Sequence, residues 1–150
     1  MSKLDEIGVS IEPPASPSQV RAILTELQTK IESLARQGIT DSVDLRSLPM
    51  FPGDYERLRE ILGYGEIHVS IDAMGPTKIY ETAFPGIWWI SHFNSDDENI
   101  AEFIEITPLP DILKTADEDI RQTGQQLQRL IESDTRDHLY NERGEADEAE

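Results

Sequence analysis

The chain contains no cysteine among its 150 residues. Disulfide bonds, thiolate catalysis and an iron–sulfur cluster held by the chain's own cysteines are therefore excluded. Long apolar runs are also missing, since no segment approaches the roughly 18 consecutive apolar residues of a transmembrane helix. Residues 1–6 lack the apolar run that a signal peptide contains, so we expect a cytoplasmic location.

Positive charge is scarce. The 13 lysines and arginines stand against 30 acidic residues, and the formal net charge is −17 at pH 7. Nucleic acid and anionic membranes are disfavoured as partners, because like charges repel and no basic stripe offsets them. A basic protein or peptide would complement this charge, since opposite potentials speed encounter. The alternative is that the acidity only keeps the chain soluble.

The length suits one ordinary domain with a core of its own. The hydrophobic fraction of 37% is low because both ends of the chain are poor in apolar residues. We expect a flexible N-terminus over residues 1–15 and a single α+β domain over residues 16–139. Residues 140–150 are expected to form a disordered acidic tail.

Three segments have the apolar spacing of helices. A capping box at residues 16–19 precedes a one-sided apolar stripe, which predicts a helix over residues 17–37 that Gly38 ends in a left-handed cap. A short second helix is predicted from Asp54 to Leu62. A second capping box at residues 115–118 begins a third helix, which we expect to run to about Leu139.

Four short strands are predicted in succession at residues 66–72, 78–84, 87–94 and 100–107, and residues 42–46 are a candidate edge strand. Phe84-Pro85-Gly86-Ile87 has the proline and glycine of a type II turn. The connections are too short for helical crossovers, so the fold class is α+β. We expect a four- or five-stranded antiparallel meander sheet with helices packed on one face.

The alternation within the strands predicts which side chains share a face. We expect the first and last helices to cover the side of Ile67, Val69 and Ile71. Trp88 and Trp89 are adjacent on a strand, so their side chains must point to opposite faces. An indole on an open face is a good anchor for a partner protein, and the alternative is that a loop or a second copy covers it.

Few residues suggest chemistry. His68 and His92, together with a nearby carboxylate, could bind nickel, iron or zinc if they share the open face. No nucleophile elbow or glycine-rich phosphate loop is present, so we expect no enzymatic activity and no cofactor.

Four phrases occur in order along the chain: DLRSLP at 44–49, LGYGE at 62–66, ETAFPGIWW at 81–89 and AEFIEITP at 101–108. Together they resemble the HupH/HyaF/HoxQ family of hydrogenase expression and formation proteins. The resemblance covers about residues 42–114. Many family members are longer and hold two related regions, whereas this chain holds one.

The resemblance implies a cytoplasmic accessory role in assembling [NiFe] hydrogenase. It implies a non-catalytic chaperone that binds the iron–sulfur small-subunit precursor, with other maturation proteins as further candidate partners. The contact surface that we expect is the open sheet face and its rim, made by Tyr80, Glu81, Trp88, His92, Phe103 and Glu105. Two alternatives remain open: a nickel or iron carrier acting through His68 and His92, and a homodimerisation module.

Overall fold

The computed structural model describes residues 19–147, which divide into two compact units between Pro110 and Asp111. This division falls inside residues 16–139, which we expected to form a single domain. The expected flexible N-terminus, residues 1–15, lies outside the described residues, as do residues 16–18 of the first capping box.

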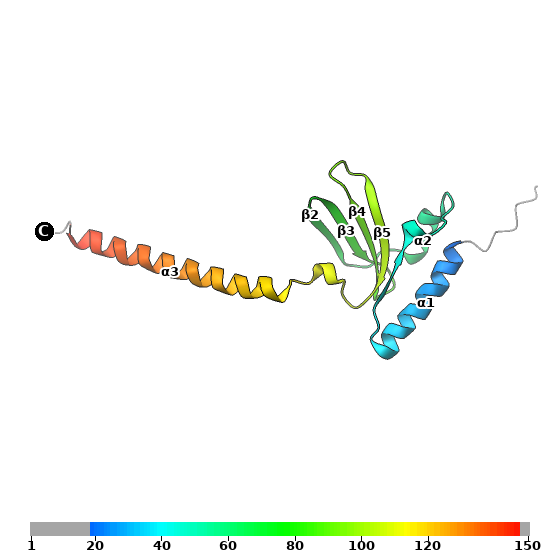
Figure 1. Ribbon diagram of the computed structural model, residues 1–150, viewed down its shortest axis with the longest axis horizontal. Helices are drawn as coiled ribbons and strands as arrows, with labels where there is room; N and C mark the ends of the chain where they lie inside the picture. The colour runs from blue at the N-terminus through cyan, green and yellow to red at the C-terminus, as the bar shows by residue number, and fades with distance from the viewer. Residues whose placement is uncertain (1–18, 148–150) are drawn as a thin grey trace, which may run out of the picture. The chain divides into compact units, whose positions relative to one another are not determined.

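The first unit contains a five-stranded antiparallel sheet with the strand order β1-β5-β4-β3-β2 (Figure 1). The predicted α+β class is confirmed, and the four predicted strands form a meander. The candidate edge strand pairs in antiparallel fashion with the last strand of that meander. The strands are β1 (Asp41–Asp44), β2 (His68–Ala73), β3 (Gly75–Glu81), β4 (Ile87–Phe93) and β5 (Asn99–Ile106).

Two helices and a short 3-10 turn complete this unit: α1 (Gln19–Gln37), α2 (Asp54–Leu62) and η1 (Leu45–Ser47). Gly38 ends α1 with a φ of +68°, and its N–H donates to the carbonyl oxygen of Leu34 at 2.9 Å. The predicted left-handed cap is therefore confirmed. A side chain at this φ would be strained, which is why glycine is favoured here.

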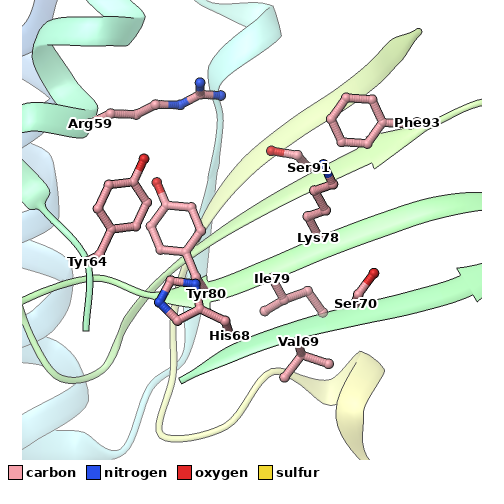
Figure 2. A pocket seen from close by; sticks show the side chains of 10 residues that line it. All are labelled: Arg59, Tyr64, His68, Val69, Ser70, Lys78, Ile79, Tyr80, Ser91 and Phe93. Carbon is pink, nitrogen blue, oxygen red and sulfur yellow. The ribbon is translucent and has the colours of Figure 1, made fainter. Parts of the chain in front are cut away.

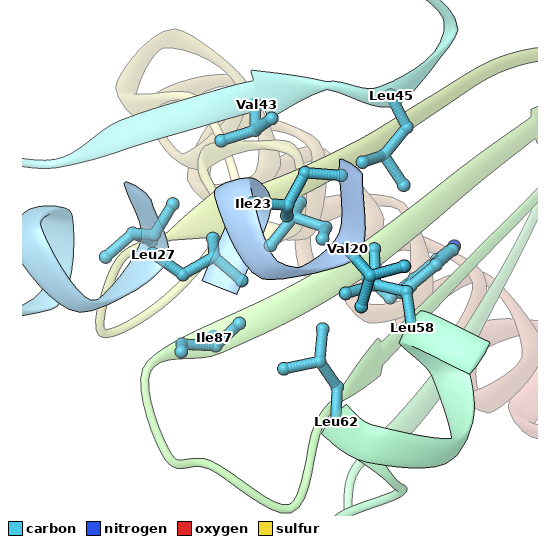
Figure 3. Close-up of a cluster of buried hydrophobic side chains, with 11 residues drawn as sticks. Val20, Ile23, Leu27, Val43, Leu45, Leu58, Leu62 and Ile87 are labelled. Atoms are coloured by element: carbon cyan, nitrogen blue, oxygen red, sulfur yellow. The ribbon is translucent and has the colours of Figure 1, made fainter. Parts of the chain in front are cut away.

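The buried core lies between the two helices and one face of the sheet (Figure 3). We call this the helix face. Its cluster consists of Val20, Ile23, Leu27, Val43, Leu45, Leu58, Leu62, Ile87, Trp89, Ile104 and Ile106.

The expectation that α1 covers the side of Ile67, Val69 and Ile71 is wrong. Val69 pairs with Ile79, which pairs with Ile90, and these side chains lie on the face opposite the helices. The side chains of Trp89 and Ile87 lie on the other side of β4, where they pack under α1 and α2. The alternation of side chains along the strands was correctly predicted, but it does not show which of the two faces of the sheet the helices cover.

Two tight turns shape the meander. Gly86 has a φ of +88°, and the N–H of Ile87 donates to the carbonyl oxygen of Phe84 at 3.1 Å, as the predicted type II turn requires. Gly75, the first residue of β3, has a φ of +124°. A Cβ atom there would lie 2.1 Å from the carbonyl oxygen of Phe93, so only glycine fits.

The second unit contains η2 (Asp111–Leu113) and the helix α3 (Asp117–Asp147). The helix runs past the expected end at Leu139, so residues 140–147 are helical rather than part of a disordered tail. Its predicted apolar stripe includes Ile120, Leu127 and Ile131, which no other described part of this second unit covers. Within residues 19–147, no helix has the length and apolarity needed to cross a membrane.

Candidate functional site

A pocket of about 480 Å³ opens over β2, β3 and β4 (Figure 2). Its polar and aromatic side chains come from five places: α2, the loop after it, and the three strands. They are Arg59, Tyr64, His68, Ser70, Lys78, Tyr80, Ser91 and Phe93.

The strand register explains why these side chains meet. His68 pairs with Tyr80, which pairs with Trp89, so all three lie on the helix face. The buried cluster draws its sheet residues from β1, β4 and β5, whereas β2 contributes none. The pocket is thus the continuation of the helix face beside the buried cluster.

Aromatic rings line one wall of the pocket. The ring centroids of Tyr64 and Tyr80 lie 4.7 Å apart, and Tyr80 stacks on Trp89 at 6.2 Å with an interplanar angle of 6°. The His68 ring stacks at 6.0 Å from Tyr64 and 5.9 Å from Tyr80. Tyr64 is 61% exposed, so this row of rings runs from the core to solvent.

A buried carboxylate holds the back of the pocket together. One oxygen of Glu102, Oε1, accepts from Arg59 Nη2 at 2.5 Å, from Trp89 Nε1 at 2.9 Å and from Ser91 Oγ at 3.0 Å. Glu102 is only 6% exposed. The guanidinium of Arg59 also lies 5.0 Å from the centre of the Trp89 ring, which fixes its plane beside the aromatic row.

Two buried polar atoms, Tyr80 Oη and Arg59 Nε, make no hydrogen bond of normal geometry within residues 19–147. Burial raises the pKa of Tyr80, and the neighbouring Tyr64 raises it further. The phenol therefore stays protonated and can donate. Buried polar atoms are normally paired, so Arg59 Nε is available to a bound group, whereas the Tyr80 hydroxyl also interacts with Tyr64.

The pocket contains two cationic side chains, Arg59, whose charge the Glu102 carboxylate balances, and Lys78. Lys78 is exposed, with its Nζ 5.4 Å from the centre of the Phe93 ring. Arginine, tyrosine and tryptophan are the residue types that contribute most to protein–protein binding. The pocket offers arginine and tyrosine, with Trp89 packed behind them, which suits the capture of a polypeptide side chain.

The structure divides the expected contact surface between the two faces. Glu81, His92, Phe103 and Glu105 are half-buried and lie on the face opposite the helices. Tyr80 lies on the helix face and belongs to the pocket.

The expectation that Trp88 lies exposed on an open face is wrong. Trp88 shares the face opposite the helices, but its side chain is 2% exposed. Its Nε1 donates to the carbonyl oxygen of Thr107 at 2.9 Å, so the indole is tied to the end of β5. In this position it stabilises the sheet and is closed to a partner.

The expectation that the two strand histidines share a face is also wrong. His68 lies on the helix face, where its Nε2 is 3.2 Å from the carbonyl oxygen of Gly65. His92 lies on the opposite face and bonds Thr77 Oγ1 through Nδ1 at 2.8 Å. The two imidazoles therefore cannot bind the same metal ion. Across the described part of the chain, no three acidic, histidine or cysteine residues are grouped as metal ligands.

Sequence reasoning did not assign most of the site, including Arg59, Tyr64, Lys78 and Glu102. A signal existed for Glu102, because it alternates with Ile104 and Ile106 on an otherwise apolar face of β5. A carboxylate in such a row must find donors, which points to a polar network. The others come together only through the tertiary fold.

Fold and pocket together define an α+β protein with an open, aromatic-lined recess on its sheet. The model of the family "HupH hydrogenase expression protein, C-terminal conserved region" matches residues 18–133. The chain therefore belongs to this family, and the resemblance found in the sequence is confirmed.

Individual relatives agree. The hydrogenase expression/formation protein HoxQ of Azotobacter vinelandii is 33% identical over 113 residues, which are 74% of this chain and 40% of HoxQ. HupH of Rhodobacter capsulatus is 29% identical over 128 residues, 84% of this chain and 46% of that protein. The chain thus spans less than half the length of these curated relatives.

A solved structure has the same fold. It is the hydrogenase expression protein HupH from Thiobacillus denitrificans ATCC 25259, with a TM-score of 0.73 and 34% sequence identity. The match covers 77% of this chain and 96% of that chain.

Proposed function

We propose that this chain is an accessory protein of hydrogenase maturation that binds the iron–sulfur small-subunit precursor in the cytoplasm and catalyses no reaction itself. Membership of the HupH family, over residues 18–133, is the observation that carries this proposal. The relatives are named for hydrogenase expression and formation, which supports a role in assembly.

The pocket on the helix face is the contact surface that we propose for the precursor. Tyr64 offers a largely exposed ring, and Arg59, Trp89 and Tyr80 hold the surface behind it rigid. A rigid aromatic surface loses little conformational entropy when it binds, so more of the contact energy appears as affinity. The net charge of −17 favours encounter with a basic client.

The opposite face provides a second proposed surface, through Glu81, His92, Phe103 and Glu105. These side chains are half-buried, so a partner would find less area there than at Tyr64. A variant at Phe103 therefore compares the two faces directly.

The test is co-purification of the tagged chain with the hydrogenase small-subunit precursor from a hydrogenase-expressing cell at low salt. Tyr64→Ala should weaken the complex by about tenfold or more, as expected for an aromatic hot spot. Tyr140→Ala is the matched control, because Tyr140 is 82% exposed and lies on α3. Phe103→Ala should have a smaller effect than Tyr64→Ala.

The possible results distinguish an error in the proposed function from an error in the proposed contact surface. If no complex with the precursor forms at low salt, the proposed function is wrong. If a complex forms but Phe103→Ala weakens it while Tyr64→Ala does not, the function stands and the contact surface lies on the opposite face.

A further inference from the structure

Strand β2 forms one edge of the sheet, and it lacks the usual features that prevent an edge strand from pairing with another chain. It pairs with β3 alone within the part of the chain that the structure describes. Natural edge strands are commonly protected by lysine, proline, a bulge or very short length. Residues His68–Ala73 contain no lysine or proline, and their register with β3 is continuous over six pairs.

The outward-facing main-chain groups of β2 can be identified from the register. The N–H of Glu81 donates to the carbonyl oxygen of Ile67 at 2.9 Å, so the odd-numbered residues of this strand bond to β3. In an antiparallel pair, alternate residues point their main-chain groups to opposite sides. The N–H and C=O groups of His68, Ser70 and Asp72 therefore face away from the sheet.

We propose that a second copy of this chain pairs with this edge, antiparallel, with the twofold axis at Ser70. In this register the residues with outward main-chain groups meet one another: His68 lies opposite Asp72 of the second copy, and Ser70 lies opposite Ser70. Each such pair exchanges two hydrogen bonds, so about six main-chain hydrogen bonds form across the axis. Two five-stranded sheets then join into one continuous sheet.

The side chains of β2 are self-complementary in the same register. On the helix face, each imidazole of His68 meets a carboxylate of Asp72, and the small Ser70 pair fills the centre. On the opposite face, Val69 meets Ile71 of the second copy, and both are half-buried in the single chain. Ile67, which is 45% exposed, meets Ala73 just beyond them. Each pair thus joins compatible side chains: histidine with a carboxylate, serine with serine, and apolar with apolar.

The other edge of the sheet shows the contrast. Strand β1 has only four residues, with an aspartate at each end. Both aspartates are exposed, and very short length and charged side chains are among the features that keep natural edge strands from pairing. The β1 edge is therefore protected against pairing with a second copy, whereas the side chains of β2 are complementary to those of a second β2.

The pairing also changes the pocket. His68 and Ser70 line it, so Asp72 of the second copy would stand at its margin. The pockets of the two copies would lie on the same face of the joined sheet. The dimer thus presents a client with paired aromatic sites, and this inference does not depend on the identity of that client.

Sedimentation velocity of the full chain tests the proposal, in about 0.3 M NaCl so that repulsion between two acidic copies is screened. The wild type should sediment as a dimer. Ser70→Pro removes an outward N–H that β3 does not use, a position where an edge strand tolerates proline, and should weaken the dimer roughly a hundredfold. Ser70→Ala keeps that N–H and should remain dimeric. A wild-type monomer, or a dimer indifferent to Ser70→Pro, overturns the proposal.

A charge reversal tests the register. His68→Asp places carboxylate against carboxylate at both symmetric positions and should weaken the dimer by about tenfold. The exchanged pair His68→Asp with Asp72→His restores opposite partners and should recover most of this loss. If the double variant is no stronger a dimer than the single one, the register is wrong.

Cross-linking gives a second, independent measurement, because the chain has no cysteine of its own. At the twofold axis the two Cα atoms of residue 70 should be about 5.5 Å apart, within the range of roughly 4.4–6.8 Å that a disulfide spans. Ser70→Cys should form a covalent dimer under mild oxidation, whereas Ser42→Cys on β1 should not. Equal cross-linking of both variants would contradict the proposed edge.

Discussion

Replacing Glu102 by alanine should be among the most destabilising single substitutions in the first unit. The carboxylate is 6% exposed and accepts three hydrogen bonds, two of them from the buried groups Trp89 Nε1 and Ser91 Oγ. Its third donor, Arg59, has a side chain that is 41% exposed. Arg59 can therefore be solvated by water after the change, whereas the Trp89 N–H cannot.

The magnitude follows from this difference. A buried donor left without an acceptor costs about 1–3 kcal/mol, and the Trp89 indole is the donor that must bear this cost. The Ser91 hydroxyl can rotate, so its loss is smaller. The removed side-chain atoms add a term for the cavity. We expect the free energy of unfolding to fall by about 2–4 kcal/mol, a large part of the roughly 5–15 kcal/mol of a typical domain.

Tryptophan fluorescence during urea unfolding is a suitable assay. Both tryptophans lie on β4 and are buried, and α3 has none, so the signal reports the first unit alone. Glu60→Ala is the matched control, because Glu60 is exposed on α2 and its loss should change stability by no more than about 0.5 kcal/mol. Adding Trp89→Phe to Glu102→Ala removes the stranded donor and should leave a cost below the sum of the two single changes.

The reasoning is refuted if Glu102→Ala costs no more than Glu60→Ala. It is also refuted if the two changes at Glu102 and Trp89 are additive, because the indole N–H would then not be the group that the carboxylate satisfies.

Three further outcomes follow from the structure. The hydrogen bond from Lys30 lowers the pKa of Asp41, so this pair stabilises the fold above the unfolded pKa of Asp41 and loses its effect as the pH falls through the lowered folded pKa. Urea unfolding should therefore show a deficit of about 0.5 kcal/mol for Asp41→Asn at neutral pH that disappears in acid, and a deficit that persists in acid would contradict this. Gly75→Ala should cost at least about 2 kcal/mol in the same assay, because its Cβ would meet the carbonyl oxygen of Phe93. A chain ending at Lys114 should unfold within about 0.5 kcal/mol of the full chain, since every member of the buried cluster precedes that point, and a larger loss would show that the first unit depends on α3.

Local patterns in the sequence were sufficient to predict most elements of the fold. The spacing of apolar residues located α1, and Gly38 marked its end because a left-handed residue follows the last turn. Alternation located the strands, and the short connections between them required an antiparallel order. These features depend on a few neighbouring residues, which is why they can be predicted from sequence.

The assignment of faces could not be obtained in this way. Trp88 and Trp89 were correctly expected to point to opposite sides, but both are buried. Alternation fixes which residues share a face, and it does not say which face the helices cover or what closes the other one. The same limit explains the histidines, since His68 and His92 were placed together without knowledge of the strand register.

The third helix shows a different limit. Its apolar stripe predicted burial, because an amphipathic helix usually covers a core. Within the described part of the second unit itself, nothing covers the stripe. A stripe of apolar residues records that a surface is suited to packing, but it carries no information about which surface it packs against.

The resemblance that identified the family also divides into structural and binding parts once the fold is known. The phrase at residues 81–89 contributes a type II turn and two buried indoles, so it builds the sheet. The phrase at residues 62–66 does something else, because it presents Tyr64 at 61% exposure. A Cβ on Gly65 would lie 2.6 Å from the carbonyl oxygen of Thr82, so glycine lets this loop lie directly against the end of β3. A large ring on a loop that is held this closely is already in position before a partner arrives, and such preorganisation lowers the entropic cost of binding. This preorganisation supports Tyr64, rather than the paired tryptophans, as the centre of the proposed client contact.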